Sequence, residues 1–261
     1  CIRDRCKNHA LEYADLAPLA YLHLALEGNT RSFGIQHLLI DEMQDYSRLQ
    51  YLIIRRMFSC KMTILGDRAQ TMADQQQDVL QFLPGIFGKD LRRIEMRKSY
   101  RNTVEIASYA ANLIGVTDLE LFERHGMPVL ERDVTDLEAA LREAVDTLFP
   151  DEKTYETAAV IVPDEKTAER AYLILREILA EKDFDCEKRL SWLNRDSSSF
   201  KKGLTVTTFY LAKGLEFDQV FSIFPKDEKR EMMMQAQYIA ATRALHELRA
   251  VSYTHLTLPT N

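Results

Sequence analysis

The stretch HLLIDEMQDY, residues 37–46, decides the fold because it joins an apolar strand directly to a cluster of acids. His37 to Ile40 predict a buried β-strand, and Asp41, Glu42 and Asp45 follow at once. Carboxylates at the end of a buried strand lose hydration, which is unfavourable unless a cation is held beside them. The stretch therefore predicts a cation-binding strand end. The alternative is a strand followed by a helix N-terminus, where acids are favourable without any ligand.

Working outward, apolar runs and helical patterns alternate along the chain. The runs that predict buried parallel strands are residues 37–40, 61–66, 158–163, 204–209 and 219–224. The helical patterns between them span residues 49–58, 103–114, 136–148, 166–180 and 231–245. Such alternation is typical of α/β layers around a parallel sheet. A charged segment places a boundary between two units near residue 95, and the Ser-rich residues 185–203 predict a surface loop or hairpin.

Composition limits the class of protein. The chain has 261 residues, of which 46% are hydrophobic, so one or two packed domains are expected. The net charge of −6 does not favour a basic nucleic-acid-binding surface, although a local groove would be enough. No apolar run approaches the roughly 20 residues of a membrane span, and no secretory signal is present. The four cysteines are too scattered for a disulfide framework or a metal site. These features predict a soluble, cytoplasmic protein without a membrane partner.

Four further stretches are unremarkable one by one but unusual in their order. TILGDRAQT (63–71) ends a strand in Gly-Asp, and KSYRNT (98–103) places an aromatic residue and an arginine before a helix. TTFYLAKGLEFDQV (207–220) combines a strand, a Lys-Gly turn and an acid, and QYIAATRAL (237–245) places an arginine on a predicted helix. Separately they predict a turn, a helix start, a surface loop and a solvated arginine.

Together these stretches resemble the motifs of superfamily 1 helicases of the UvrD/Rep type, over residues 37 to 250. DEMQD (41–45) resembles motif II, Gly66-Asp67 with Gln70 resembles motif III, and Tyr100-Arg101 resembles motif IV. TTFYLAKGLEFD resembles motif V and YIAATRAL resembles motif VI. The resemblance implies two RecA-like lobes with parallel sheets, the fold of P-loop nucleoside triphosphatases, and a site for ATP and Mg²⁺ between them.

The resemblance also implies roles in the first lobe. Asp41 would bind Mg²⁺, and Glu42 would activate the attacking water. Gln70 would couple the state of the nucleotide to the neighbouring domain. Gln44 is a further position at which the family contacts the nucleotide.

In the second lobe the resemblance implies contacts to nucleotide and to nucleic acid. Tyr100 would stack on the base, and Glu216 would bind the ribose, with Gly214 beside it. Arg101 would reach the γ-phosphate and Arg243 would act as the arginine finger. Single-stranded DNA is the implied partner, contacted more weakly by Thr208, Tyr210 and Lys213.

The phosphate-binding loop GxxxxGK(S/T) does not occur in the sequence. In the family this loop precedes motif II, so the resemblance implies the C-terminal part of a longer helicase, inactive without its N-terminal portion. The alternative is a relative that no longer binds ATP. We expect residues 1–95 to form the C-terminal part of the first lobe, with a preceding amphipathic helix, and residues 96–253 to form the second lobe. Residues 254–261 are expected to be a tail, disordered or non-native.

Departures from the family pattern indicate a branch. Motif V has Tyr210 where a histidine is usual, and no aromatic-Arg pair follows motif III. Residues 104–206, between motifs IV and V, are too few for the large inserted domain of UvrD and Rep. These features are closer to the helicase IV/HelD branch, some of whose members act on RNA polymerase. Three hypotheses follow: a DNA-dependent translocase, an ATPase that remodels or releases RNA polymerase, and a non-catalytic binding module.

Overall fold

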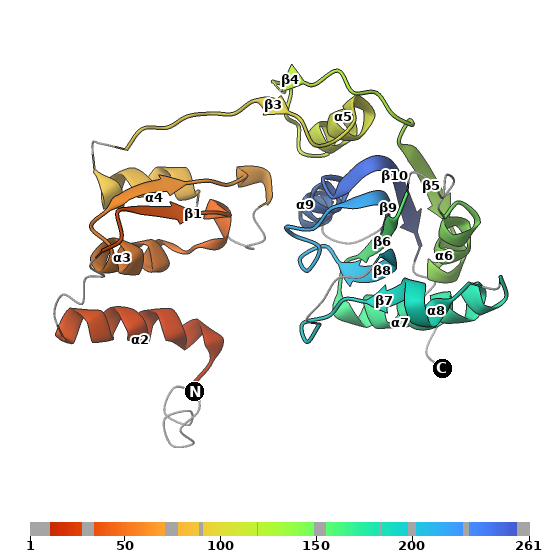
Figure 1. The fold of residues 1–261 in the computed structure, drawn as a ribbon, viewed down its shortest axis with the longest axis horizontal. Helices are drawn as coiled ribbons and strands as arrows, with labels where there is room; N and C mark the ends of the chain where they lie inside the picture. Colours follow the sequence, from red (N-terminus) through yellow and green to blue (C-terminus); the bar gives the residue numbers. More distant parts are fainter. Residues whose placement is uncertain are drawn as a thin grey trace. The chain divides into compact units, whose positions relative to one another are not determined.

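In a computed structural model the chain divides into two compact units, Cys1–Glu95 and Met96–Asn261 (Figure 1). The structure describes residues 11–27, 34–70, 78–88, 91–118, 120–148, 155–182, 184–197, 202–226 and 230–254. The expected tail, apart from its first residue, and the residues that follow motif III therefore lie outside the described residues. Each unit is described by itself.

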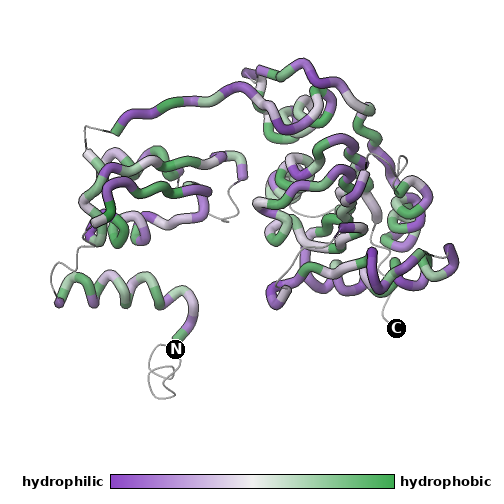
Figure 2. Tube along the Cα trace, viewed as in Figure 1, coloured by the Kyte–Doolittle hydropathy of each residue, from purple (hydrophilic) through white to green (hydrophobic). Residues whose placement is uncertain are grey.

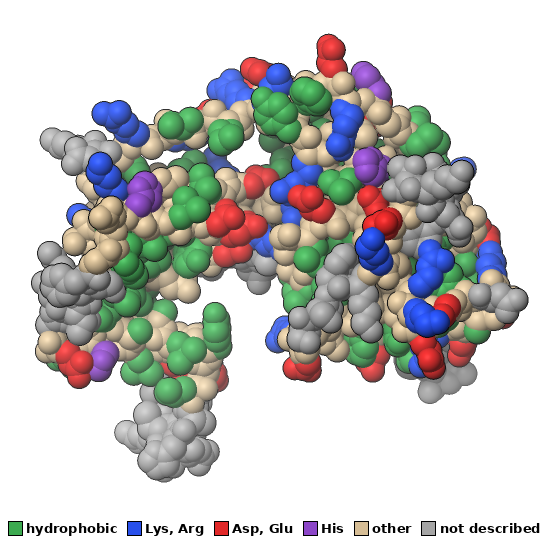
Figure 3. All heavy atoms as spheres, in the orientation of Figure 1, with side chains coloured by type: hydrophobic (Ala, Val, Ile, Leu, Met, Phe, Trp, Pro, Cys, Tyr) green, Lys and Arg blue, Asp and Glu red, His purple; other side chains and the backbone are tan. Residues whose placement is uncertain are grey.

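Among the described residues, unit 1 begins with helix α2 (Tyr13–Leu26), in the segment where an amphipathic helix was expected. The helix is present, but it is not amphipathic, because its apolar residues are spread around all of its sides. Its first turn is closed by a capping box between Glu12 and Asp15. Hydrophobic positions occur along its length, and none of its residues is buried (Figure 2). Its apolar side chains are visible on the surface in Figure 3, and Leu22 is 52% exposed. The helix lies beside α3, where the Arg56 guanidinium is 5.2 Å from the centre of the Tyr21 ring.

The rest of unit 1 is a pair of parallel strands with helices on one face. Strands β1 (His37–Ile40) and β2 (Lys61–Ile64) pair in register from His37 and Lys61 onward. Helices α3 (Arg48–Met57) and α4 (Val79–Phe87) supply most of the core around the fully buried Tyr51. Both predicted strands are present, although β2 ends at Ile64 rather than at residue 66. The prediction that they are buried is wrong for most of their residues, and no residue of β2 is buried. Only Ile40 is buried in β1, and Leu39 is 63% exposed because it points away from the helices.

Unit 2 contains a six-stranded sheet in which every pair of neighbours is parallel. The strand order is β5-β10-β9-β6-β8-β7. The strands are β5 (Leu130–Val134), β6 (Thr157–Val162), β7 (Leu190–Trp192), β8 (Gly203–Thr208), β9 (Phe217–Pro225) and β10 (Ala244–Tyr253). The predicted α/β fold with a parallel sheet is confirmed.

Helices cover both faces of this sheet, which explains its apolar strands (Figure 1). Helices α6 (Leu137–Asp146) and α7 (Glu165–Ala180) pack on one face, and α5 (Val104–Leu113) and α9 (Arg230–Ala241) pack on the other. In β6, Ala158 and Val160 point into the first core while Ala159 and Ile161 point into the second. A strand that is buried on both faces must be apolar at successive positions, as β6 is.

Two predictions about unit 2 are wrong. The described part of residues 185–203 is not a hairpin, because α8 (Cys186–Arg189) is followed by β7, which pairs in parallel with β8. The helix predicted to run to residue 245 ends at Ala241, so Arg243 lies in a turn rather than on a helix. The residues after this turn form β10, a ten-residue strand beside β9 and β5. The alternation of inward and outward side chains along β10 is interrupted by a shift in its pairing with β9 between Ala244 and Glu247. The sequence therefore lacks the regular pattern of a strand.

Among the described residues, the structure contains no helix that is both long and apolar enough to cross a membrane.

Candidate functional site

The acids of residues 41–45 lie where β1 ends and the chain turns sharply. Glu42 has φ 53° and ψ 51°, and among the described residues it is the one non-glycine residue with positive φ. Its amide donates a 2.8 Å hydrogen bond to Oδ1 of Asp41. This backbone conformation costs an L-residue roughly 1–2 kcal/mol, and such strain tends to occur at functional sites. The turn leaves Asp41 exposed and Glu42 partly buried.

A buried glutamine connects these acids to the residues that follow β2. Gln44 is 7% exposed, and its Oε1 accepts a 3.1 Å hydrogen bond from the amide of Asp67. Its Nε2 donates to Oε2 of Glu42 at 2.6 Å. Gln70 in turn donates from Nε2 to Oδ2 of Asp67 at 3.0 Å. The structure thus brings together Glu42, Gln44 and Gln70, three of the residues singled out in the sequence.

Backbone hydrogen bonds hold the ends of β1 and β2 against each other. The amide of Leu65 donates to the carbonyl of Ile40, and the amide of Met43 donates to the carbonyl of Leu65, both at 2.8 Å. The hydroxyl of Tyr51 also donates to the carbonyl of Met43, at 3.0 Å. A Cβ at Gly66 would lie 2.6 Å from the Met43 nitrogen and 2.4 Å from Gln44 Oε1. Glycine is therefore required at position 66, where the turn after β2 packs against the turn after β1.

The donor set at the end of β1 fits a magnesium ion that arrives with a nucleotide. Among the described residues no group of three or more His, Cys, Asp or Glu side chains could hold a metal by itself. Mg²⁺ is usually held by one or two carboxylates together with substrate phosphates and water, not by a cage of protein ligands. Asp41, exposed at the end of β1, provides one such carboxylate, and Oε2 of the adjacent Glu42 accepts the hydrogen bond from Gln44.

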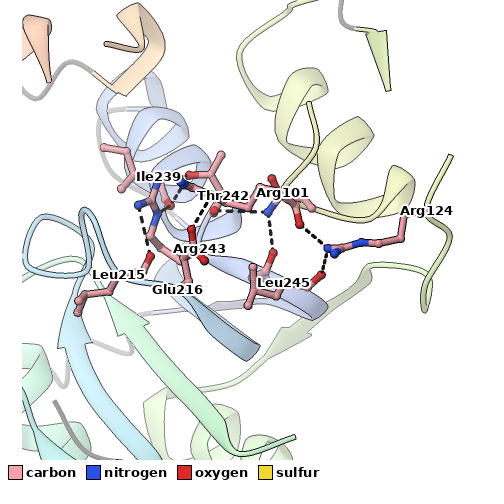
Figure 4. Close-up of polar contacts among 10 residues, drawn as sticks. Arg101, Arg124, Leu215, Glu216, Ile239, Thr242, Arg243 and Leu245 are labelled. Carbon is pink, nitrogen blue, oxygen red and sulfur yellow. Dashed lines mark hydrogen bonds and ion pairs between the residues drawn. The ribbon is translucent and has the colours of Figure 1, made fainter. Parts of the chain in front are cut away.

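In unit 2, several predicted residues meet where β9 and β10 begin (Figure 4). Nε of Arg101 is 2.7 Å from Oε1 of Glu216, and both side chains are nearly half exposed. Arg243 is only 2% exposed. Its Nε donates to the carbonyl of Ile239 at 3.2 Å and its Nη1 to the carbonyl of Leu215 at 3.4 Å. A cation beside the last carbonyls of α9 is also favourable for that helix.

Two residues missed in the sequence fix the backbone around Arg101. Asn102 is buried, and its Nδ2 donates to the carbonyl of Ala244 at 2.6 Å. Arg124 donates from Nη2 to the carbonyl of Leu245 at 2.8 Å and also to the carbonyl of Arg101. These bonds join the segment before α5 to the turn that carries Arg243. Asn102 follows Arg101 in the motif IV stretch, so it could have been considered, whereas nothing in the sequence pointed to Arg124.

Tyr100 forms an exposed aromatic surface with a neighbour brought in by strand pairing. It is 61% exposed, and its ring centre is 5.6 Å from that of Phe122. The short strands β3 (Lys98–Ser99) and β4 (Glu120–Leu121) pair in parallel and align the two rings. Nζ of Lys98 is 5.5 Å from the centre of Tyr100 and 5.9 Å from that of Phe122. Exposed rings can stack on a nucleobase, and an ammonium group beside them can attract the phosphates attached to that base.

The residues predicted to contact nucleic acid follow the carboxyl end of β8. The residues predicted to contact the nucleotide lie instead at the amino ends of β9 and β10. Thr208 is the last residue of β8, whereas Arg243 and Glu216 directly precede the first residues of the parallel strands β10 and β9. Thr208 is fully buried, and its Oγ1 accepts from the amide of Leu211 at 3.4 Å. Tyr210 and Lys213 are partly exposed in the following turn, where Gly214 has φ +82°.

These features define an α/β protein with acids at the carboxyl end of a parallel strand, the position at which proteins of this class bind ligands. The sequence profile of the UvrD/REP helicase N-terminal domain matches residues 3–72, a segment that contains Asp41, Glu42, Gln44, Asp67 and Gln70. No curated protein matches the chain.

Solved structures that are similar to parts of the chain include three that are described as helicases or as a domain of a possible helicase. The first, the C-terminal domain of a possible DNA helicase from Lactobacillus plantarum WCFS1, is 24% identical, with a TM-score of 0.44 over 62% of this chain and 94% of that one. The PRRSV helicase is 15% identical, with a TM-score of 0.45 over 87% of this chain and 37% of that one. An arterivirus helicase, nonstructural protein 10, is 15% identical, with a TM-score of 0.40 over 84% of this chain and 39% of that one.

Proposed function

We propose that this chain is part of an ATP-dependent helicase or translocase of the UvrD/Rep type, which couples hydrolysis of Mg-ATP to movement on single-stranded DNA. The observation that carries the proposal is the hydrogen-bonded group at the ends of β1 and β2, where Glu42 is connected through Gln44 to Asp67. This group lies within the residues that match the helicase family. Unit 1 would then belong to the first RecA-like lobe, and unit 2 would be the second.

In unit 1 the proposed chemistry is activation of water beside a metal-bound phosphate. Asp41 would hold the Mg²⁺ that accompanies ATP, and this ion would neutralise charge on the phosphates. Glu42 would accept a proton from the attacking water. Gln70, held by Asp67, would respond to the presence of the terminal phosphate.

In unit 2 the proposed chemistry is charge neutralisation and binding of the base. Tyr100 offers an exposed ring for stacking, and Glu216 is positioned by its ion pair with Arg101. Arg101 and Arg243 would neutralise charge on the phosphoryl oxygens, a contribution worth about 10³- to 10⁵-fold in rate for an arginine finger. For Arg243 this requires Nη1 to exchange the carbonyl of Leu215 for a phosphate oxygen.

Contacts to DNA are proposed for Tyr210 and Lys213, in the turn that follows β8. The aromatic ring and the ammonium group provide the stacking and charge that single strands require. Strands β8 and β9 both pair in parallel with β6, so the carboxyl end of β8 and the amino end of β9 lie at opposite ends of the strands. The proposed DNA contacts begin at the first of these ends, and the proposed nucleotide contacts lie at the second. A movement of this unit could therefore connect the two ligands.

The test is ATP hydrolysis by the full-length protein, with and without single-stranded DNA. Glu42→Gln keeps the shape of the side chain and removes the base, so kcat should fall by about 10²-fold or more. The control is Glu27→Gln, the same chemical change at an exposed acid paired with His23 in α2. It should leave turnover unchanged.

Three outcomes separate the hypotheses. Turnover that DNA stimulates and that Glu42→Gln abolishes supports the translocase. Turnover that depends on Glu42 but not on DNA contradicts it and favours an ATPase that remodels a protein such as RNA polymerase. Absence of turnover in the wild type would leave only a non-catalytic binding module.

A further inference from the structure

We infer that Gln44 is a positioning residue, which orients the Glu42 carboxylate and ties it to the loop that carries Asp67 and Gln70. The inference rests on the proposed function and deepens it, because it gives Gln44 a role that does not require contact with the nucleotide. Three features carry the inference: the fixed orientation of the Gln44 amide, the confinement of its side chain, and the continuity of the hydrogen bonds beyond it.

The orientation of the Gln44 amide is dictated by its two partners. The backbone N–H of Asp67 can only donate, so the atom of Gln44 that faces it at 3.1 Å must be the oxygen. The nitrogen then faces Glu42, and it donates to Oε2 at 2.6 Å. A carboxylate accepts this bond in its ionised form, which is the form that takes a proton from water.

Confinement keeps this arrangement in place. Gln44 is 7% exposed, and Gly66 lies so close that an added Cβ would be 2.4 Å from Gln44 Oε1. The backbone of Glu42 is held in the left-handed region, which directs its side chain back toward residue 44. A rotation of the Gln44 side chain would therefore break hydrogen bonds at both ends and leave buried polar groups unpaired.

The hydrogen bonds continue past Gln44 to a second candidate residue. Oδ2 of Asp67 accepts a hydrogen bond from Nε2 of Gln70 at 3.0 Å. Its Oδ1 accepts another from the amide of Ala69 at 2.9 Å. A displacement of Gln70 would thus be transmitted through Asp67 and Gln44 to the Glu42 carboxylate. This provides a physical connection between a residue that responds to phosphate and the proposed base.

The test compares two substitutions of similar length in the full-length protein. Gln44→Glu keeps an oxygen toward the Asp67 amide but places a second oxygen against Oε2 of Glu42. Gln44→Met removes both hydrogen bonds. We expect kcat to fall about 10- to 100-fold in each variant, the loss typical of a misplaced catalytic group, with little change in KM for ATP.

Two readouts distinguish positioning from a purely structural role. The first is the separation of kcat from KM: kcat should fall in both variants while KM for ATP stays close to wild type, because only the orientation of Glu42 is changed. Hydrogen exchange at the Asp67 amide should quicken in Gln44→Met and stay slow in Gln44→Glu.

The results that would overturn the inference differ from those that would overturn the proposed function. If Glu42→Gln is inactive but both Gln44 variants turn over like wild type, the inference is wrong and the proposed function stands. Unchanged exchange at Asp67 in Gln44→Met also overturns the inference, whatever the turnover. If Glu42→Gln is as active as wild type, the proposed function fails, and Glu42 is not a base that needs positioning.

Discussion

Gly66→Ala tests most directly the close packing between the turns that follow β1 and β2. The added Cβ would lie 2.6 Å from the Met43 nitrogen and 2.5 Å from Met43 Cγ, whereas ordinary contact begins at 3.4 Å. Relief requires the Met43 backbone to withdraw by about 0.8 Å. That movement would break its bond to Leu65 and disturb the bond between Gln44 and Asp67.

The expected cost of Gly66→Ala can be estimated from these contacts. Two hydrogen bonds contribute about 0.5–1.5 kcal/mol each, and overpacking a filled site costs about 1–3 kcal/mol. We therefore expect unit 1 to lose about 3 kcal/mol. With a urea dependence of about 1–2 kcal/mol per molar for a small unit, its unfolding midpoint should fall by about 2 M.

The position of the tryptophan makes the assay specific to each unit. Trp192 is the one tryptophan of the chain and lies in unit 2. Urea unfolding followed by far-UV circular dichroism reports both units, whereas Trp192 fluorescence reports unit 2. Gly66→Ala should shift the dichroism transition and leave the fluorescence transition in place.

The matched control for Gly66→Ala is Gly85→Ala in helix α4 of the same unit. A Cβ there meets nothing within 4 Å, so the variant should gain about 0.5–1 kcal/mol from helix propensity. A dichroism transition for Gly66→Ala that matches wild type would refute the reasoning.

Three more predictions concern single residues. Glu42→Gly should be about 1 kcal/mol more stable than Glu42→Ala in chemical denaturation, because φ is positive at residue 42 and glycine adopts this conformation without strain. If the alanine variant is the more stable, the backbone at residue 42 is not strained. Asn102→Ala should cost unit 2 about 1–3 kcal/mol by Trp192 fluorescence, since it removes a buried hydrogen bond, whereas the exposed Asn112→Ala should cost under about 0.5 kcal/mol. Hydrogen bonds from His125 and the Gly126 amide lower the pKa of Glu105 from 4.5 to about 2. Its contribution to stability is therefore full above pH 4.5 and is lost as pH falls toward 2, so wild type should lose its advantage over Glu105→Gln across that range in urea titrations.

The sequence predicted best those elements that are buried on both faces. Strands β6, β8 and β9 are almost entirely buried because helices cover each side of the sheet, and they contain one charged residue, Asp218, among them. Short runs of this kind predict buried parallel strands. Strand β10 was missed because polar residues interrupt it and its register shifts near its start. Strand β7 was missed because three residues at the sheet edge carry too short a pattern.

The candidate site divides in the same way. Asp41 and Glu42 were predicted because they directly follow a predicted strand, and Gln70 because its stretch resembles motif III. The parallel pairing of β1 and β2 explains why Glu42 and Gln70 belong to one hydrogen-bonded group. Arg124 could not be found, since its contact with Arg101 depends on the pairing of two-residue strands far apart in sequence. The burial of Arg243 was equally unpredictable, because it results from the ending of α9 two residues earlier.

The strand order of unit 2 has a consequence for how the chain is made. Of the six strands in this sheet β10 is the last in sequence, but it lies second in the sheet, between β5 and β9. During synthesis β5 therefore has no hydrogen-bonding neighbour until residues 244–253 leave the ribosome, although β6, β8 and β9 can already associate. A stalled or shortened chain would present the open edges of β5 and β9, which are templates for pairing with other chains. The turn that carries Arg243 forms only when this gap is filled, so the proposed catalytic arginine would be placed only after the other five strands of this sheet have been made.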